Sequence, residues 1–417
     1  MQRNNKIKVA VIGGGAAGMM AAGTALKNGA EVTVFEHSGR LGKKLAITGK
    51  GRCNVTNNCT TDEFIQNVMS NPRFMYAPIS EFSTQDTMSF FEGLGVPLKT
   101  ERGRRVFPES DKASDIVSAM KRQIYGAKIV FENVKSIKTE NSKAVGVITE
   151  NGEYSFDRII IATGGKSYPL TGSDGSGYKL AAALGHRITA IKPSLVPIEA
   201  NGDICSRMQG LSLKNTKVTV VDENGNKIYE DFGELLFTHF GISGPTVLSA
   251  TAHLGKYDVG TLSFILDLKP ALDEKTLDAR ILSDFSKAKN RDFGNALSGL
   301  LPSKMAALIP QIVQIPSDKK VNEITKDERK RLVSVLKSFK ITLKRLRPID
   351  EAIVTRGGVD TKEISPKTMQ SKLVSSLYFA GEVIDVDAYT GGYNLQIAFS
   401  TGYVAGLNAS KEDNASC

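Results

Sequence analysis

A run of small residues near the start of the chain has the spacing of a loop that binds phosphate. Residues 13–18 read Gly-Gly-Gly-Ala-Ala-Gly and directly follow an apolar segment, 8–12, that reads as a strand. Residues 16–27 then read as a helix, and residues 30–36 as a second strand that ends in Glu36. Strand, glycine turn, helix and strand in this order are the context that a dinucleotide-binding fingerprint requires. The spacing therefore predicts a dinucleotide site.

Each residue type has a physical role in such a site. Gly13 permits the tight turn, Gly15 lets the backbone approach a pyrophosphate, and Gly18 allows the helix to pack closely on the strand. The pyrophosphate then meets the unpaired N–H groups at the positive end of the helix. The Glu36 carboxylate can accept hydrogen bonds from ribose hydroxyls, and an acidic residue there disfavours a 2′-phosphate. FAD or NAD therefore fits better than NADP.

The far end of the chain distinguishes FAD from NAD. Residues 377–382 read as a strand that runs into Gly381-Glu382, and residues 391–396 open a helix that continues through Gly406. In FAD-binding folds of the glutathione-reductase type, such a strand places an acid on the ribityl chain. The positive end of the following helix then faces the flavin pyrimidine ring. An unrelated strand-turn-helix would look the same locally, but its pairing with the N-terminal loop favours FAD.

A third element lies in the middle of the chain. Residues 158–165 read as an apolar strand that ends in Ala-Thr-Gly-Gly, a pattern typical of flavoproteins whose backbone passes the cofactor there. Residues 127–149 read as strands of a small sheet, and Val134 falls where that segment would contact adenine. The glycine-rich stretch 172–177 is not followed by a strand-helix-strand unit. We therefore expect no separate nicotinamide domain, and NADH or NADPH would have to donate electrons by docking directly over the flavin.

Composition sets the broad class of the protein. With 417 residues, 41% hydrophobic and 24% charged, the chain fits two or three globular domains. No apolar run is long enough to cross a bilayer. The four cysteines are scattered and form no Cys-x-x-Cys pair, which argues against a disulfide scaffold and a zinc knuckle and indicates a reducing cytoplasm; they are Cys53, Cys59, Cys205 and Cys417. No set of metal ligands is visible.

The net charge is +10, from 54 Lys and Arg against 44 Asp and Glu. A generally basic surface explains this excess, and so does an anionic substrate or cofactor. The densest basic stretches, 102–105 and 326–331, are short and lack the interleaved aromatic residues that nucleic-acid binding requires. We therefore expect a small-molecule substrate and no nucleic acid. The sequence does not indicate an oligomeric state.

Eight separated motifs make the chain resemble the BaiN-like, or aminoacetone-oxidase-like, FAD flavoproteins over nearly its whole length. They are VIGGGAAG at 11–18, KKLAITGKGRCNVTN at 43–57, RRVFPESDKA at 104–113, ATGGKSYPLTGSDGSGY at 162–178, LGH at 184–186, GELLFTHFGISGP at 233–245, TRGGV at 355–359 and GEVIDVDAYTGGYNLQIAFSTG at 381–402. GRCN and FTHFGISGP are specific, whereas the outer glycine motifs occur in many flavoproteins.

The resemblance implies an α/β fold: a split Rossmann-like FAD-binding domain of the glutathione-reductase type with an inserted domain. The expected FAD-binding domain comprises residues 1–193 and 343–417. A β-barrel-like substrate subdomain is expected at 194–269 and a helical subdomain at 270–342. The expected FAD contacts are Gly13, Gly15, Ala16, Ala17, Gly18, Glu36, His37, Lys43, Lys44, Gly51, Arg52, Cys53, Asn54, Val134, Ala162, Thr163, Gly164, Gly381, Glu382, Gly392, Asn394, Leu395 and Gln396.

Several of these residues have an alternative interpretation. Lys43, Lys44 and Arg52 would neutralise the pyrophosphate or hold polar edges of the flavin, or they form a solvated basic loop. Cys53 lies where the chain would pass the isoalloxazine, but no base adjoins it in sequence, so a packing role is favoured over a nucleophile.

Three residues are candidates for acid–base chemistry: His239, Tyr393 and Tyr168. His239 lies in a specific motif of the insert, in strands expected to cover the flavin; a structural hydrogen bond is its alternative role. Tyr168 and Tyr393 would donate a proton to substrate or only pack on the ring.

The implied reaction is hydride transfer between a small organic substrate and the flavin. A reductase of a conjugated C=C bond in an enone, such as an oxo-bile-acid intermediate, is the first expectation. An amine or aminoacetone oxidase that releases peroxide is the second. A flavin-bound protein that interacts with RNA or has a regulatory role is the third, and its only support in the sequence is the basic charge.

Overall fold

The computed structural model describes residues 6–412, and the chain divides into two compact units. Unit 1 comprises Met1–Ser194 with Ile349–Cys417, and unit 2 comprises Leu195–Pro348. The boundary expected at 343 is wrong, because it falls inside a barrel strand of unit 2, β17 (Phe339–Leu346). Cys417 lies outside the described residues.

Unit 1 contains a five-stranded parallel sheet, which confirms the expected Rossmann-type fold. Its strands are apolar and almost fully buried, as expected for a sheet covered on both faces. In spatial order they are β19 (Leu377–Phe379), β10 (Arg158–Ile161), β1 (Lys8–Ile12), β2 (Glu31–Phe35) and β6 (Lys128–Val130). β6 belongs to the part of the chain expected to form only the small sheet.

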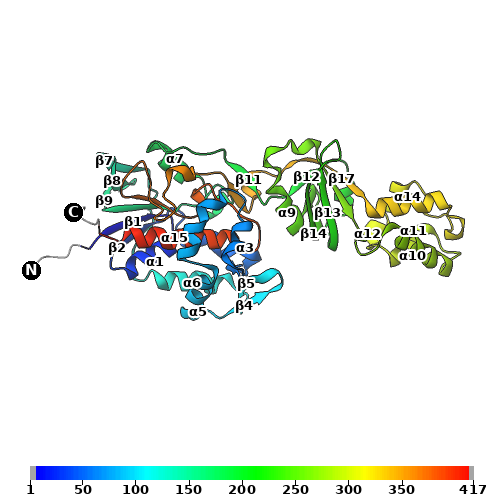
Figure 1. Cartoon of the computed structure of the whole chain (residues 1–417), viewed down its shortest axis with the longest axis horizontal. Coiled ribbons are helices and arrows are strands. Elements are labelled where there is room, and N and C mark those ends of the chain that lie inside the picture. The colour runs from blue at the N-terminus through cyan, green and yellow to red at the C-terminus, as the bar shows by residue number, and fades with distance from the viewer. Residues whose placement is uncertain (1–5, 413–417) are drawn as a thin grey trace, which may run out of the picture. The chain divides into compact units, whose positions relative to one another are not determined.

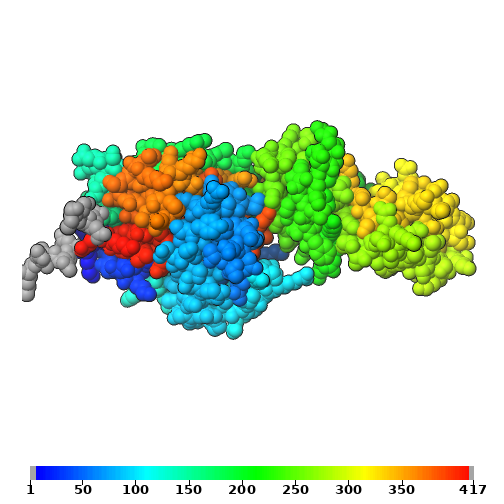
Figure 2. Space-filling view, in the orientation of Figure 1, coloured from blue at the N-terminus to red at the C-terminus, as the bar shows by residue number. Residues whose placement is uncertain are grey.

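Two helices from opposite ends of the sequence pack together on this sheet. They are α1 (Ala16–Lys27) and α15 (Tyr393–Ala409), drawn in blue and red in Figure 1, and the two ends of the chain are also neighbours in Figure 2. A Cβ at Gly402 would lie 2.5 Å from the Ala17 carbonyl oxygen, and one at Gly406 would lie 2.3 Å from that of Ala21. The glycines therefore allow backbone-to-backbone contact between the two halves of the predicted cofactor domain.

The remaining elements of unit 1 surround this core. A small antiparallel sheet is formed by β7 (Ser136–Glu140), β8 (Lys143–Ile148) and β9 (Glu153–Ser155). A second one contains β3 (Thr56–Asn57), β5 (Arg105–Pro108) and β4 (Leu98–Glu101), and β11 (Lys192–Ser194) pairs with β18 (Val354–Arg356). The other helices of at least five residues are α2 (Lys43–Ile47), α3 (Thr61–Gln66), α4 (Tyr76–Glu81), α5 (Thr84–Gly93), α6 (Ala113–Gln123) and α7 (Ser176–Ala183).

Unit 2 combines a closed six-stranded barrel with helices that share its apolar core. The barrel strands, in spatial order, are β12 (Ile198–Ala200), β15 (Gly241–Ser243), β14 (Lys227–Phe237), β13 (Ser212–Val221), β16 (Ser263–Asp267) and β17. The main helices are α9 (Pro245–Thr251), α10 (Glu274–Lys287), α13 (Ile309–Val313) and α14 (Lys326–Lys337), with short helices α8 (Ile204–Arg207), α11 (Phe293–Ala296) and α12 (Ser303–Ala306). Because β17 follows α14 in sequence, the chain leaves the barrel after β16 and returns to close it.

Within residues 6–412, no helix is long and apolar enough to span a membrane. No group of His, Cys, Asp or Glu in the same range could hold a metal ion.

Candidate functional site

The glycine loop lies where the order of the parallel strands reverses. β1 is flanked by β2 on one side and β10 on the other, and the crevice at such a switch point is the usual ligand site of an open α/β sheet. Gly13 has φ +108°, and a Cβ there would lie 2.4 Å from the Ala162 carbonyl oxygen. A Cβ at Gly18 would lie 1.8 Å from the Gly13 carbonyl oxygen. The structure thus gives Gly13 and Gly18 local reasons to be glycine.

Gly15 differs from these two glycines because the space next to it is open. A Cβ at Gly15 would meet no atom within 4 Å. Gly15 caps α1, which has no side-chain cap and no acidic residue in its first turn, so Ala16 and Ala17 begin a helix whose positive end is not neutralised. Open space in front of unpaired helix N–H groups fits a pyrophosphate.

Glu36 lies beside this loop, as expected. Its Oε2 accepts a hydrogen bond from Gly14 N at 2.9 Å, and its Oε1 accepts one from Ser38 N at 2.7 Å. Only 8% of the residue is exposed. A carboxylate has about four acceptor sites, so two remain for ribose hydroxyls. The next residue, His37, lies 3.8 Å from the Asp174 carboxylate, with the distance measured from Nε2 to Oδ2.

The C-terminal half of the predicted site meets the N-terminal half at Gly381. This residue has φ +77°, and its N–H donates to Thr401 Oγ1 at 2.9 Å. A Cβ at Gly381 would lie 2.6 Å from the Ala17 Cβ, in the first turn of α1. Residues 162–164 and 381–382 therefore lie next to the glycine loop at the carboxyl edge of one sheet.

Glu382 is surrounded by three donors. Lys44 Nζ lies 2.6 Å from its Oε2, while Ser167 Oγ and Thr355 N donate to its Oε1 at 2.9 and 2.7 Å. Burial alone would raise the pKa of Glu382, but the Lys44 cation and these hydrogen bonds hold it below its ordinary value. Sequence reasoning identified Lys44 and Glu382 but not their mutual contact. It missed Ser167 and Thr355, although both lie in the motifs 162–178 and 355–359.

Three buried side-chain atoms near this edge lack a hydrogen-bond partner in the described part of the chain: Thr163 Oγ1, the Tyr178 hydroxyl and Asp387 Oδ1. Thr163 is one of the predicted cofactor residues. Burial raises the pKa of both Tyr178 and Asp387, and Ser194 Oγ donates to Asp387 Oδ2 at 2.8 Å. Buried polar atoms normally have partners. The unpartnered Thr163 hydroxyl, the open space at Gly15 and the acceptor capacity of Glu36 together fit a bound FAD.

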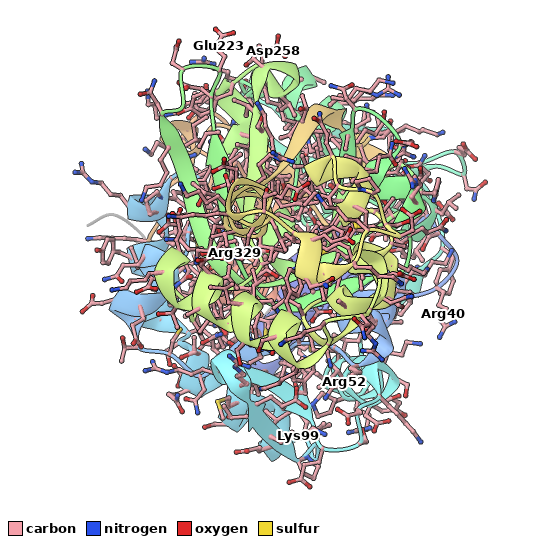
Figure 3. All side chains as sticks on the ribbon, turned by 90° about the vertical axis from the view of Figure 1, so that its right-hand side faces the viewer. Arg40, Arg52, Lys99, Glu223, Asp258 and Arg329 are labelled. Atoms are coloured by element: carbon pink, nitrogen blue, oxygen red, sulfur yellow. The ribbon has the colours of Figure 1, made fainter. Side chains whose placement is uncertain are left out.

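Arg52 does not have the role expected for a phosphate-binding cation. Its guanidinium pairs with Glu101 and Asp111, at 2.5 Å each, and lies 4.2 Å from the centroid of the Phe107 ring. Lys99 shares the Asp111 carboxylate at 2.7 Å, and Figure 3 shows Arg52 and Lys99 in the same region of unit 1. The hydrogen bonds to Glu101 and Asp111 raise the pKa of Arg52. Its charge is thus already matched by carboxylates of the protein.

The other predicted residues of this loop are ordered by local contacts. Lys43 Nζ donates to the Ser38 carbonyl oxygen at 2.5 Å. Gly51 has φ +84° and open space beside it. Cys53 is fully buried, and burial raises the pKa of its thiol to about 12, which favours the predicted packing role. With its carbonyl turned toward α15, the Asn54 amide accepts a hydrogen bond from Gly392 N at 3.0 Å.

The start of α15 offers backbone rather than side chains. Gly392 caps this helix, which has no side-chain cap and no acidic residue in its first turn. The Asn394 amide is bonded to Ala388 and Tyr389, and the buried Gln396 amide is bonded to Thr56, Phe82, Ser83 and Ser400. Leu395 packs against the core, and Val134 is buried in it. The positive end of α15 is thus available, whereas the Asn394 and Gln396 side chains are used internally, contrary to the expectation of direct contacts.

The structure places two of the three acid–base candidates in unit 1. Tyr393 begins α15, and its half-buried ring lies 5.9 Å from that of Phe64. Burial raises the pKa of the Tyr393 phenol to about 12. Tyr168 follows β10 in a left-handed conformation, with φ +54°.

His239 lies in unit 2, in the exposed turn between β14 and β15, with its ring edge-on to Phe240. The structure prints no hydrogen bond for this ring, so the alternative structural role gains no support within the described residues.

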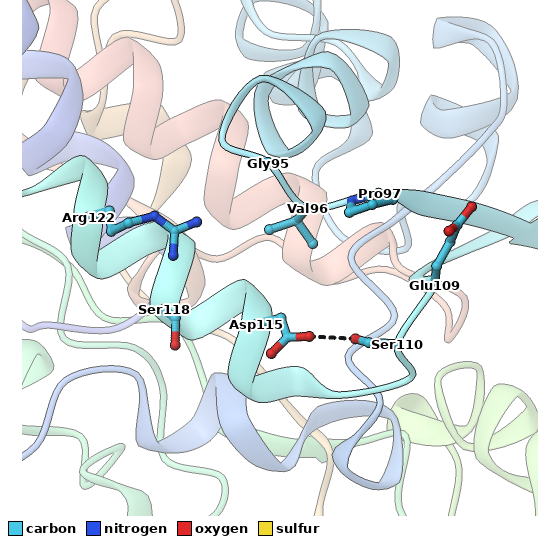
Figure 4. A pocket seen from close by; sticks show the side chains of 8 residues that line it. All are labelled: Gly95, Val96, Pro97, Glu109, Ser110, Asp115, Ser118 and Arg122. Carbon is cyan, nitrogen blue, oxygen red and sulfur yellow. Dashed lines mark hydrogen bonds between the residues drawn. The ribbon is translucent and has the colours of Figure 1, made fainter.

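A separate surface pocket of about 410 Å³ lies in unit 1 (Figure 4). It contains the side chains of Asp115 and Glu109 and that of Arg122, which donates to the Leu94 carbonyl oxygen. None of the residues predicted to contact cofactor or substrate lines this pocket.

Comparison with known proteins identifies relatives along the full chain. The model of the HI0933-like protein Rossmann domain matches residues 7–408. A 3-dehydro-bile acid delta(4,6)-reductase of Clostridium scindens is 30% identical over 97% of this chain and 99% of its own. A ribosomal RNA dihydrouridine synthase of Haemophilus influenzae is 33% identical over 96% of this chain and 98% of its own.

A similar fold occurs in a 3-ketosteroid delta1-dehydrogenase of Sterolibacterium denitrificans, solved with 1,4-androstadiene-3,17-dione. The TM-score is 0.54 at 13% identity, over 98% of this chain and 100% of the other. The sequence motifs, the split Rossmann-type sheet and the family match agree. The chain belongs to the HI0933-like Rossmann-domain family and is an FAD-dependent oxidoreductase.

Proposed function

We propose that the protein uses FAD to reduce a carbon–carbon double bond conjugated to a carbonyl group. The observation that carries this proposal is the pair of full-length relatives at 30% and 33% identity. One is named as a delta(4,6)-reductase of a 3-dehydro bile acid, and the other as a dihydrouridine synthase. Dihydrouridine is uridine with its C5–C6 bond saturated, and in uridine that bond is conjugated to the C4 carbonyl. The two names thus describe the same bond change on different substrates.

Bound FAD supplies the hydride in this reaction. The residues of unit 1 would then have separate tasks: Gly15 and the start of α1 hold the pyrophosphate, and Glu36 holds the adenosine ribose. Lys44 keeps Glu382 ionised beside the ribityl chain. The start of α15 stabilises negative charge on the pyrimidine side of the ring.

Saturation of a conjugated double bond also requires a proton at the carbon that does not receive the hydride. Tyr393 has a phenol with a pKa of about 12, so it is protonated at neutral pH and can act as a donor but not as a base. Tyr168 and His239 are the other candidates for this step. NADH or NADPH is the electron donor that we propose for the FAD.

Of the two substrate classes, we place a uridine in ribosomal RNA first. The net charge of +10 favours a polyanion over a neutral or anionic steroid. This order reverses the expectation from sequence, which placed RNA last because the basic stretches lack interleaved aromatic residues. A ribosomal RNA substrate also accords with the cytoplasmic location expected from the cysteines. A steroid-like enone is the second candidate, favoured by the Clostridium scindens relative.

The test is product analysis with the FAD-loaded protein under anaerobic conditions. NADPH or NADH is added with in vitro transcripts of the ribosomal RNAs, with a 3-oxo-4,6-diene steroid, or with aminoacetone. The proposal predicts that nucleosides from digested RNA include uridine heavier by two hydrogens. Loss of the steroid dienone absorbance without any change in RNA would select the enone instead. Peroxide formation from aminoacetone on admission of air, with neither reduction, would contradict the proposal and support an oxidase.

A further inference from the structure

The β4–β5 hairpin carries a basic tip. The chain turns at Arg102–Arg104, and the sequence Arg102-Gly103-Arg104-Arg105 is exposed throughout. Figure 2 shows this hairpin, in cyan, projecting from the body of unit 1. Gly103 and Arg104 both have left-handed backbone conformations, with φ of +76° and +57°.

Two of the arginines at this tip lack a matching carboxylate. The carboxylates nearby are Glu63, Glu101 and Asp111. Arg104 pairs with Glu63 at 2.5 Å, whereas Glu101 and Asp111 are held by the Arg52 and Lys99 cations, as described above.

Arg102 and Arg105 form no ion pair within the described range 6–412. Arg105 Nε donates only to the Arg102 carbonyl oxygen, at 3.1 Å, and its guanidinium lies 5.7 Å from the Phe107 ring centroid. These two guanidiniums therefore carry uncompensated positive charge on a surface whose other charges are paired.

The tip is attached to the start of α15, where the flavin ring is proposed to lie. The Asn57 amide nitrogen donates both to the Gly103 carbonyl oxygen at 3.1 Å and to the Gly391 carbonyl oxygen at 3.0 Å. Gly391 directly precedes the cap of α15, and a Cβ there would lie 3.1 Å from the Tyr393 ring. One side chain thus connects the basic tip to the helix start that we assign to the flavin and to a candidate proton donor.

We propose that Arg102 and Arg105 bind the phosphodiester backbone of the RNA substrate next to the uridine that is reduced. This inference rests on the proposed function, since it assigns the residues that would hold its polyanionic substrate. Guanidinium groups bind phosphate through paired N–H donors, and each phosphate contact displaces a bound counterion. The Arg104–Glu63 pair and the Asn57 bridge hold the tip in one conformation, which reduces the ordering cost of binding.

The experiment compares Arg102→Ala/Arg105→Ala with a control of equal charge change, Lys27→Ala/Lys143→Ala. Lys27 ends α1, opposite the glycine loop, and Lys143 lies on β8; both are exposed. The FAD-loaded proteins are titrated with labelled in vitro transcripts of the ribosomal RNAs at several salt concentrations. Flavin absorbance and melting temperature establish that each variant is folded, and Arg102→Lys/Arg105→Lys serves as a second variant that keeps the charge.

The arginine-to-alanine variant is expected to bind the transcripts roughly tenfold more weakly near 0.1 M salt. Its log–log salt slope should fall by about 1.4, at about 0.7 for each lost contact to a single strand. The lysine variant should lie in between, because lysine keeps the charge but loses the paired donors. The control should bind as the wild type does, and reduction of the flavin by NADPH should be unchanged in all four proteins.

Wild-type affinity and slope in the arginine-to-alanine variant, with dihydrouridine still formed by the wild type, would overturn this inference and leave the proposed function standing. An equal loss in the control would also overturn it, since general charge would then explain binding. If the wild type neither binds nor reduces the transcripts, the inference fails together with the RNA substrate.

Discussion

Lys44 and Glu382 are 338 residues apart in sequence, yet the Lys44 Nζ lies 2.6 Å from the Glu382 Oε2. Lys44 belongs to α2, just after the N-terminal nucleotide unit, and Glu382 follows β19 near the C-terminus. Their side chains are only 23% and 19% exposed. This ion pair therefore joins the two halves of the split FAD-binding domain at the edge of the sheet where we place the cofactor.

Replacement of Lys44 by Met should destabilise the protein in a pH-dependent way. The folded-state pKa of Glu382 lies below its ordinary value, so the ion pair contributes stability above about pH 4 and loses it as the carboxyl becomes protonated. Without the cation, a largely buried carboxylate is left unpaired, at a cost of about 2 kcal/mol near pH 7. The deficit in unfolding free energy should narrow toward pH 4. Urea denaturation at several pH values measures this, and Lys50→Met, an exposed lysine of the same loop, is the control. A deficit that is constant with pH would contradict the assignment.

Gly15 and Gly18 should respond differently to substitution by alanine. A Cβ at Gly18 would overlap the Gly13 carbonyl oxygen at 1.8 Å, so Gly18→Ala should lower the unfolding free energy by roughly 2 kcal/mol or more. Gly15 has open space and a negative φ, so Gly15→Ala should leave the stability of the FAD-free protein unchanged. Gly15→Glu should also fold but bind FAD at least roughly tenfold more weakly, because its charge opposes the pyrophosphate. Flavin titration by fluorescence measures the affinity. Normal FAD binding by Gly15→Glu would show that the cofactor does not approach this loop.

Cys53 should be inert and dispensable for catalysis. Its thiol is fully buried and has a pKa of about 12, so the reactive thiolate is scarce at pH 8. Cys53→Ala should retain bound flavin and the rate of flavin reduction. Iodoacetamide at pH 8 should leave Cys53 unmodified in the native protein but label it in urea, as seen by peptide mass spectrometry. Rapid native labelling of Cys53 with loss of activity would instead indicate a nucleophile.

His186 should make the protein less stable in mild acid. Its side chain is fully buried between Glu363 and Ser371, at 3.0 and 2.9 Å, and burial lowers its pKa. The unfolded chain therefore binds a proton below about pH 6.5 that the folded chain resists, so stability falls as the pH drops below that value. His186→Gln should have a lower unfolding free energy at pH 8 but a flatter dependence between pH 5 and 7. An identical slope in variant and wild type would show that other groups cause the acid sensitivity.

The sequence was sufficient wherever a local pattern carried the information. The glycine loop, Glu36 and the β10 and β19 strands were predicted because fixed spacing between glycines, apolar runs and acids reflects one supersecondary unit. The position of β17 could not be predicted, since a strand that closes a barrel after a long helical excursion pairs only with distant residues. The partners of Arg52 were missed for the same reason: Glu101 and Asp111 are 49 and 59 residues away. Asn394 and Gln396 were assigned to the flavin from their motif, but their amides satisfy backbone groups of neighbouring loops, which a motif does not reveal.

The most direct test of the central claim is to reduce the FAD-loaded protein without oxygen and to follow the return of flavin absorbance after rapid mixing. Ribosomal RNA transcripts, a 3-oxo-4,6-diene steroid and air-saturated buffer are the three oxidants. A conjugated-bond reductase should be reoxidised faster by one of the two unsaturated substrates than by oxygen, in an amount equal to the product formed. Rapid reoxidation by oxygen alone, with peroxide released and neither substrate consumed, would contradict the account.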